Sequence, residues 1–193
     1  MLKKEHLHKK INGEGLTFCG KYDLIYLSKI ISEVKVNMKE FVKVVFDCGA
    51  KKMYTLWYSE INNGFAKEGD LLICFSKESL LDTYCDTRDY ILSEATVVFP
   101  VAEFKAWLEH KGNLPDMNTV LDFWNICSDL AFTQQDTYAG DEDDEDTEGL
   151  YDTLYAACEE PDAVQLTQDE EEKLAEILTD GLELVRTYIK PLK

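Results

Sequence analysis

The sequence predicts an α+β fold, in which a small β-sheet of about three to four short strands packs with several helices, an acidic flexible loop and a C-terminal helix. Short apolar or alternating runs of strand length occur at 52–60, 71–75 and 96–99. Longer stretches with helical spacing follow at 118–132 and 167–189. The chain has 193 residues, of which 45% are hydrophobic, so it can form a real core and is too apolar to be disordered.

Two helical patterns open the chain. Apolar side chains over 23–34 fall at helical spacing. We predict a second helix over 38–47, because Asn37 and Glu40 have the spacing of a capping box and the apolar residues that follow share one helical face. A strand is the alternative, since 41–46 is rich in β-branched residues.

The middle of the chain predicts strands and helices in alternation. Side chains alternate over 52–60, and 71–75 is a continuous apolar run typical of a strand that is covered on both faces. Ser76 has the chemistry to cap a helix that extends to Tyr84. A strand over 96–99 then precedes a helix over 101–110.

The C-terminal part is predicted to be helical. The clearest pattern covers 118–132, a short helix is expected over 150–158, and Thr167 and Glu170 have the spacing of a capping box that opens a last helix to about 189. The last helix should bury one apolar face: Leu174, Ile177, Leu178, Leu182 and Val185.

These patterns suggest one folded domain. We expect a basic flexible arm over 1–15, an α+β core over 16–138, an acidic disordered loop over 139–149, and helices over 150–193 that pack on the core. Two domains joined by the acidic tract are the alternative.

Charge is strongly uneven along the chain. The net charge is −18, and the 22 Asp and Glu against five Lys and Arg in 110–193 account for −17 of it. Ala139–Gly149 alone holds seven carboxylates and no base. Such a charge disfavours direct binding of nucleic acid, whose phosphates would be repelled, and favours a basic protein partner. Solubility alone is the alternative explanation.

The cysteines and the hydropathy indicate a reduced, cytoplasmic protein. Six cysteines are irregularly spaced, and no pair forms Cys-x-x-Cys. The N-terminus is basic without the apolar stretch of a secretory signal, and no run of apolar residues is long enough to span a membrane.

Sequence signatures of catalysis are absent. There is no Gly-x-Ser-x-Gly, phosphate-binding loop or His-Glu-x-x-His motif, so we expect no catalytic residue and no cofactor. A nucleophile pair of Cys85 or Cys127 with His110 is the enzyme alternative. The acidic tract from Asp144 is similar to the start of an EF-hand loop, but Tyr155 stands where the closing carboxylate belongs, so no metal site is predicted.

The partner-binding surface is predicted on the polar stripe of the 118–132 helix and on the acidic tract. Carboxylates accelerate the encounter with a basic protein, and tyrosines provide anchors. An ordinary solvated helix face and loop are the alternative interpretation. The candidate residues are acidic, amide and aromatic side chains: Asp122, Asn125, Asp129, Asp136, Tyr138, Asp141, Glu142, Asp143, Asp144, Glu145, Asp146, Glu148 and Tyr151.

Three segments, 71–81, 98–108 and 120–131, resemble small acidic bacterial immunity proteins of polymorphic or contact-dependent toxin systems. The resemblance extends over roughly 37–132 and is one of general character, so no functional residue carries over by position. It implies a small α+β protein without catalytic residues that inhibits a toxin encoded beside it, in many cases a nuclease. A non-catalytic adaptor with another partner is the alternative function, and the oligomeric state stays open.

Overall fold

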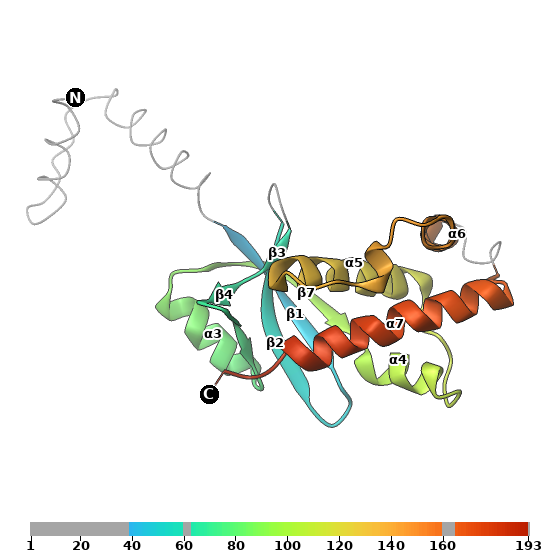
Figure 1. Ribbon diagram of the computed structural model, residues 1–193. Helices are drawn as coiled ribbons and strands as arrows, with labels where there is room; N and C mark the ends of the chain where they lie inside the picture. The colour runs from blue at the N-terminus through green and yellow to red at the C-terminus, as the bar shows by residue number, and fades with distance from the viewer. Residues whose placement is uncertain (1–38, 60–62, 160–164, 193) are drawn as a thin grey trace, which may run out of the picture. The chain divides into compact units, whose positions relative to one another are not determined.

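The computed structural model describes residues 39–59, 63–159 and 165–192, which belong to one compact unit that begins at Lys39 (Figure 1). The arm expected over 1–15 and the helix expected over 23–34 lie outside the described residues. The predicted α+β class is confirmed: a mixed sheet of five strands and a small separate hairpin pack with five helices in the described part of the chain.

The main sheet is built around β1 (Glu40–Asp47), which pairs antiparallel with β2 (Lys52–Tyr58) and parallel with β7 (Ile91–Phe99). Two strands of two residues each, β3 and β6, also pair antiparallel with β2. The hairpin is formed by β4 and β5. The short strands are β3 (Gly64–Phe65), β4 (Lys67–Glu68), β5 (Leu71–Leu72) and β6 (Cys74–Phe75).

The helix predicted over 38–47 is wrong, because this segment forms the central strand β1. Phe41 faces the side of the sheet that carries α3 (Glu78–Thr87), whereas Val44 and Phe46 face the other side. Both faces of β1 are therefore covered, so apolar residues occur on consecutive positions and imitate a helical face. The β-branched residues of the segment fit the pleated strand, as the alternative interpretation held.

The other strand predictions are confirmed with adjusted boundaries. The alternation predicted over 52–60 holds in β2, where Met53 and Trp57 contact one core and Leu56 the other. The run over 71–75 is divided into β5 and β6 at Ile73, whose N–H donates to the Ala66 carbonyl at 2.9 Å. The strand predicted over 96–99 extends back to residue 91 as β7.

The helices follow the predicted patterns, except that the cap predicted at Ser76 is wrong. The chain is still extended at Lys77, which is the N-cap of the following helix, and no side chain makes a capping hydrogen bond there. Asp116 caps α5 by accepting a hydrogen bond from the Thr119 N–H at 3.0 Å, and the capping box of Thr167 and Glu170 opens α7 as expected. All five apolar residues predicted for the buried face of the last helix are buried. The helices are α3 (Glu78–Thr87), α4 (Val101–Leu108), α5 (Met117–Gln134), α6 (Glu145–Glu159) and α7 (Gln168–Tyr188).

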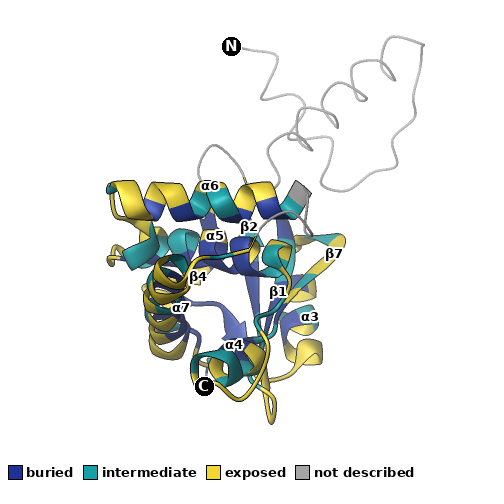
Figure 2. Cartoon of the chain, turned by 90° about the vertical axis from the view of Figure 1, so that its right-hand side faces the viewer, coloured by how far each residue is buried: buried dark blue, intermediate teal, exposed yellow. Residues whose placement is uncertain are grey.

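The helices form unequal layers on the sheet. In Figure 1, α3 lies on one side, and α4, α5 and α7 lie on the other. The larger core joins the sheet to α4, α5, α6 and α7, and the smaller one lies under α3. Figure 2 shows the buried strands and inner helix faces between these layers. Helix α5 lies at the centre of the larger core, with Phe123, Trp124 and Cys127 buried along it.

The five cysteines in the described residues are free thiols. Burial raises the pKa of the Cys74 thiol to about 12, and it raises the pKa values of Cys85 and Cys127 as well. These thiols therefore stay protonated at neutral pH. In the described part of the chain, no helix has both the length and the apolar character that crossing a bilayer requires.

Candidate functional site

The acidic tract is folded rather than one irregular loop, so the loop expected over 139–149 is wrong for this segment. Ala139–Asp141 forms a 3-10 turn (η1), and the helix α6 already begins at Glu145, five residues before the predicted start of that helix. Carboxylates in the first turn of a helix are stabilised by the exposed N–H groups and the helix dipole, so the charge density of the tract is compatible with helix formation.

Asp144 organises the start of α6. Its carboxylate accepts hydrogen bonds from the Thr147 hydroxyl at 2.7 Å, from the Thr147 N–H at 2.9 Å and from the Asp146 N–H at 3.0 Å. These bonds, led by that from the Thr147 hydroxyl, lower the pKa of Asp144. Asp144 therefore caps α6, which is a structural role. The sequence prediction had assigned this residue to partner binding.

Tyr138 belongs to the core and cannot anchor a partner directly. Only 3% of its surface is exposed, and burial raises its pKa well above the ordinary value. The following Gly140 lies against the Tyr138 ring and the indole of Trp124, and its carbonyl accepts a hydrogen bond from Trp124 Nε1 at 3.0 Å. The Ala139 N–H donates to Asp180 Oδ2 on α7 at 2.8 Å. Together these contacts fix residues 138–141 against α5 and α7.

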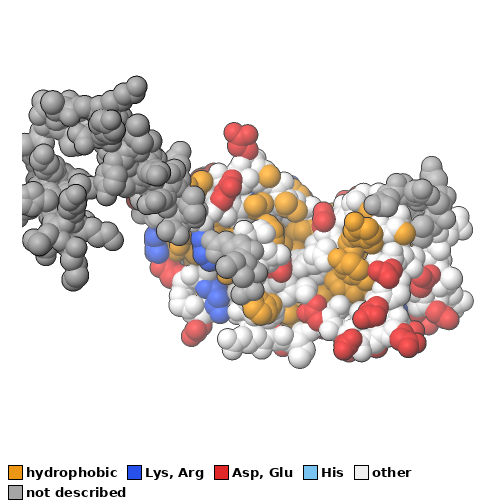
Figure 3. Space-filling view, turned by 90° about the horizontal axis from the view of Figure 1, so that it is seen from above, with side chains coloured by type: hydrophobic (Ala, Val, Ile, Leu, Met, Phe, Trp, Pro, Cys, Tyr) orange, Lys and Arg blue, Asp and Glu red, His pale blue; other side chains and the backbone are white. Residues whose placement is uncertain are grey.

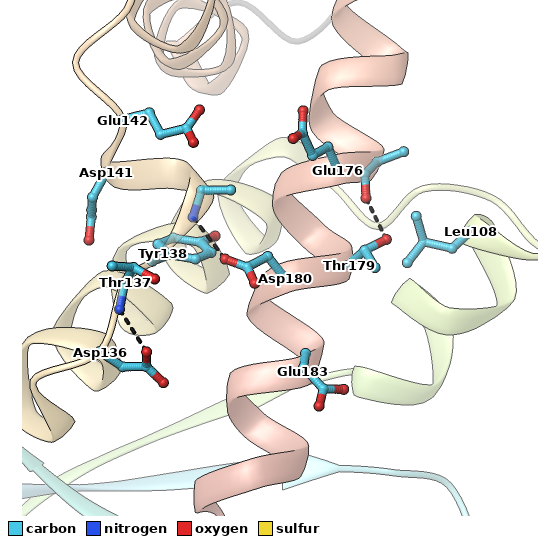
Figure 4. A pocket seen from close by; sticks show the side chains of 12 residues that line it. Leu108, Asp136, Thr137, Tyr138, Asp141, Glu142, Glu176, Thr179, Asp180 and Glu183 are labelled. Atoms are coloured by element: carbon cyan, nitrogen blue, oxygen red, sulfur yellow. Dashed lines mark hydrogen bonds between the residues drawn. The ribbon is translucent and has the colours of Figure 1, made fainter.

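An acidic groove runs between this segment and α7 (Figure 4). It has a volume of about 1140 Å³ and is open to solvent. Figure 4 shows the side chains of residues 136–142 on one wall and those of α7 on the other, with Leu108 of α4 at the side. Six carboxylates line the groove, and no Lys or Arg is among the lining residues: Asp136, Asp141, Glu142, Glu176, Asp180 and Glu183.

Half of these carboxylates were missed by the sequence prediction. Glu176, Asp180 and Glu183 are spaced four and three residues apart, so they share one face of α7. That spacing is visible in the sequence, but only the apolar face of this helix entered the prediction. The carboxylates of residues 136–142 and those of α7 form two acidic rows that face one another. The two rows are far apart in the sequence, so the sequence alone does not show that they meet.

Among the predicted residues, the structure brings the carboxylates of Asp136, Asp141 and Glu142 to the groove, together with the largely buried Tyr138. The Tyr188 hydroxyl donates to Asp136 at 2.6 Å and is the main cause of its lowered pKa. Asp141 accepts a hydrogen bond from the Ser128 hydroxyl. The remaining acidic residues of the tract do not line the groove: Asp143, Asp144, Glu145, Asp146 and Glu148.

Two of the three predicted residues on the polar stripe of α5 have hydrogen bonds within the chain. Asp129 is half-buried, and its carboxylate accepts a hydrogen bond from Trp57 Nε1 of β2 at 2.7 Å. The Tyr151 hydroxyl donates to Asn125 Oδ1 at 3.1 Å, which ties α6 to α5. Asp122 is exposed, and desolvation together with the charge of Asp116 raises its pKa.

One lysine lies at the end of the acidic groove. Lys173 Nζ is 3.2 Å from a Glu142 oxygen, 3.8 Å from Asp144 and 3.7 Å from Glu176. Desolvation opposes protonation of this lysine, but the surrounding carboxylates outweigh it and raise the pKa. Two carboxylates from the segment between η1 and α6 and one from α7 thus converge on one ammonium group, which shows that this end of the groove can hold a cationic side chain.

The molecular surface shows a similar excess of acidic side chains around the groove. On the face shown in Figure 3, Asp and Glu side chains gather over the end of the molecule formed by α6 and α7, whereas the visible Lys and Arg lie at the other end. No group of His, Cys, Asp and Glu side chains within the described ranges has a geometry that could hold a metal ion. The carboxylates of the groove can accept hydrogen bonds and attract cationic side chains.

Comparisons with protein-family models, with curated proteins and with solved structures found no match to this chain.

Proposed function

We propose that the protein is an immunity-type inhibitor, which binds a basic toxin of the nuclease class with one-to-one stoichiometry through the acidic groove. The observation that carries this proposal is the lining of the groove, with six carboxylates and no Lys or Arg. The net charge of −18 and the concentration of acidic residues after residue 109 support it. The resemblance to small acidic immunity proteins adds the class of partner.

The inhibition follows from charge and shape. A nuclease holds the phosphates of its substrate with Lys and Arg side chains, and these are the groups that a carboxylate-lined groove attracts. A protein that covers this basic surface excludes nucleic acid from it. No reaction is required of the inhibitor, so its activity depends only on affinity and on the rate of association.

The groove has features that a mobile acidic tail would lack. One wall is fixed by hydrogen bonds to α5 and α7, and the other is a helix of 21 residues. Carboxylates held at fixed positions lose little conformational entropy on binding, which improves affinity. The charge of the whole chain adds steering, which can raise the association rate by about 10- to 1000-fold at low salt.

The first test is binding to the protein encoded next to this chain's gene, measured as association rate and affinity over a range of salt concentrations. The rate should fall steeply between low salt and about 0.15 M, where charges separated by more than about 8 Å are screened. An interaction that does not depend on salt, or a captured partner without a basic surface, would contradict the proposal and favour an adaptor function.

Two double variants with the same change in charge locate the site. Glu176→Gln with Glu183→Gln removes two groove carboxylates, whereas Glu145→Gln with Glu148→Gln removes two carboxylates of the acidic tract outside the groove. We expect the groove variant to lose roughly tenfold or more in affinity and the tract variant to lose only about two- to threefold. Equal losses would mean that net charge, rather than the groove, determines binding.

A further inference from the structure

The sheet has one long edge whose pairing is incomplete in the described structure. Strand β7 has nine residues and pairs with β1 along one side. No strand in the described ranges pairs with its other side. An unpaired edge presents backbone N–H and C=O groups in a row, which can extend the sheet with a further strand.

The opposite edge of the sheet is closed. The Phe65 N–H of β3 donates to the Thr133 hydroxyl of α5 at 3.0 Å, and the Cys74 carbonyl of β6 accepts from the Leu192 N–H at 2.8 Å. Both strands of that edge are only two residues long. On β7, by contrast, the one hydrogen bond to a side chain is local, from the Ala95 N–H to the Ser93 hydroxyl at 3.4 Å.

The side chains of β7 also leave its edge accessible. Val98 is 50% exposed and Ile91 is 38% exposed, and Figure 2 shows most of the strand as intermediate or exposed. Glu94 is the single charged residue in β7, and the strand contains neither Lys nor Pro, the residues that commonly protect an edge. An irregularity in the register with β1 falls around residues 93–95, so the regular segment is 96–99.

We propose that β7 is a self-association edge, along which a second copy of this chain pairs antiparallel to form one continuous sheet. A two-fold axis perpendicular to the sheet keeps equivalent faces on the same side, so residues of equal parity stand opposite one another. Pairing about Val97 places Thr96 opposite Val98 of the other copy, on the face of the sheet that carries α3. The exposed part of the Val98 side chain is then covered in both copies, because the two-fold axis repeats the contact.

The charge of the edge segment is compatible with a second copy as the occupant. The segment 96–99 has no charged residue, so two copies bring no like charges directly opposite one another. The groove carboxylates belong to other elements, because none of the lining residues comes from β7. Each copy still carries −18, so the remaining repulsion should be screened by salt and dimerisation should strengthen as salt increases.

The size of the contact predicts a weak dimer. Pairing of one short segment buries less than the roughly 800 Å² per partner of a standard stable interface, so we expect dissociation constants of about 10 μM to 1 mM. The proposal does not depend on the groove or on a basic partner, and the opposite salt dependence of the two interactions separates their tests.

Sedimentation of the full chain over about 10 μM to 1 mM, at about 0.15 M and about 0.5 M salt, tests this proposal. Val98→Lys and, separately, Thr96→Lys should weaken dimerisation at least about tenfold, because each places an ammonium group in the strand pair. Leu80→Lys is the matched control, since Leu80 is 48% exposed on α3 and does not belong to the edge. A chain that stays monomeric throughout, or a loss of dimer that is equal in all three variants, would overturn the proposal.

Discussion

The hydrogen bond between Trp57 of β2 and Asp129 of α5 connects the sheet to its central helix, and its removal should weaken the fold measurably. The indole Nε1 donates to Asp129 Oδ2 at 2.7 Å, and both side chains are half-buried. In Asp129→Ala the indole N–H loses its partner in a position where water has limited access. We therefore predict that this variant is less stable than the parent chain.

The magnitude follows from two opposing contributions. A hydrogen bond to a charged group stabilises by about 1.5–3 kcal/mol, but removal of the half-buried carboxylate also relieves its desolvation, so we expect a net loss of about 1–2 kcal/mol. Asp122→Ala is the matched control, because Asp122 lies on the same helix, is exposed and has no hydrogen-bond partner among the described residues. Both variants gain the helix propensity of Ala, so the difference between them measures the net contribution of the hydrogen bond and of the desolvation of Asp129.

Asp129→Asn separates the hydrogen bond from the charge. The amide oxygen can still accept from Trp57, so this variant should stay within about 1 kcal/mol of the parent chain at pH 7. Desolvation, opposed by the Trp57 bond and assisted by the charge of Asp141, raises the pKa of Asp129 above its ordinary 3.8. The folded chain then binds more protons than the unfolded chain between 3.8 and the raised pKa, so this residue's contribution to stability falls as pH rises through that interval.

Urea unfolding followed by tryptophan fluorescence and by circular dichroism gives the required free energies. The order of stability at pH 7 should be Asp129→Asn above Asp129→Ala, with Asp122→Ala within about 0.5 kcal/mol of the parent chain. Asp129→Ala and Asp122→Ala with equal free energies of unfolding would refute the structural role of the bond. Asp129→Asn as unstable as Asp129→Ala would show that charge, rather than the hydrogen bond, matters.

Two further substitutions test the elements that shape the groove and its helical wall. Gly140→Ala should destabilise by about 2–4 kcal/mol, because the added Cβ would lie 2.5 Å from Tyr138 Cε1 and 2.6 Å from Trp124 Nε1; thermal unfolding measures the loss, and an unchanged melting temperature would contradict this packing. Thr167→Ala removes the hydroxyl of the capping box with Glu170 and should destabilise by about 1 kcal/mol, whereas Thr167→Ser should retain most of the stability; equal effects of Ala and Ser in urea unfolding would argue against the cap.

Most of the fold could be predicted from the sequence because periodicity and capping residues are local signals. The capping box at Thr167 and the apolar face of α7 are examples, since both depend only on residues within one helix. The helix prediction over 38–47 was wrong for a physical reason. A strand that is buried on both faces loses its alternation of apolar and polar residues, so its apolar pattern also fits a helix. The first half of β7 was missed because polar residues at 93–94 and the bulge interrupt its strand pattern.

The site was less accessible to sequence reasoning because it depends on tertiary contacts. Acidic residues could be identified as such, but only the fold shows that Tyr138 is buried and that Asp129 is bonded to Trp57. The facing rows on residues 136–142 and on α7 come together because α5 and α7 pack on the same core. Sequence separation conceals such a juxtaposition, even though each row is visible by itself.

The most direct test of the central claim compares the salt dependence of partner binding for the parent chain and for the Glu176→Gln, Glu183→Gln variant. If the groove holds the basic surface of the partner, the variant should associate more slowly at low salt, and the plot of log affinity against log salt concentration should become less steep. The Glu145→Gln, Glu148→Gln control should keep a slope close to that of the parent chain. Identical slopes for the parent chain and the groove variant would contradict the account.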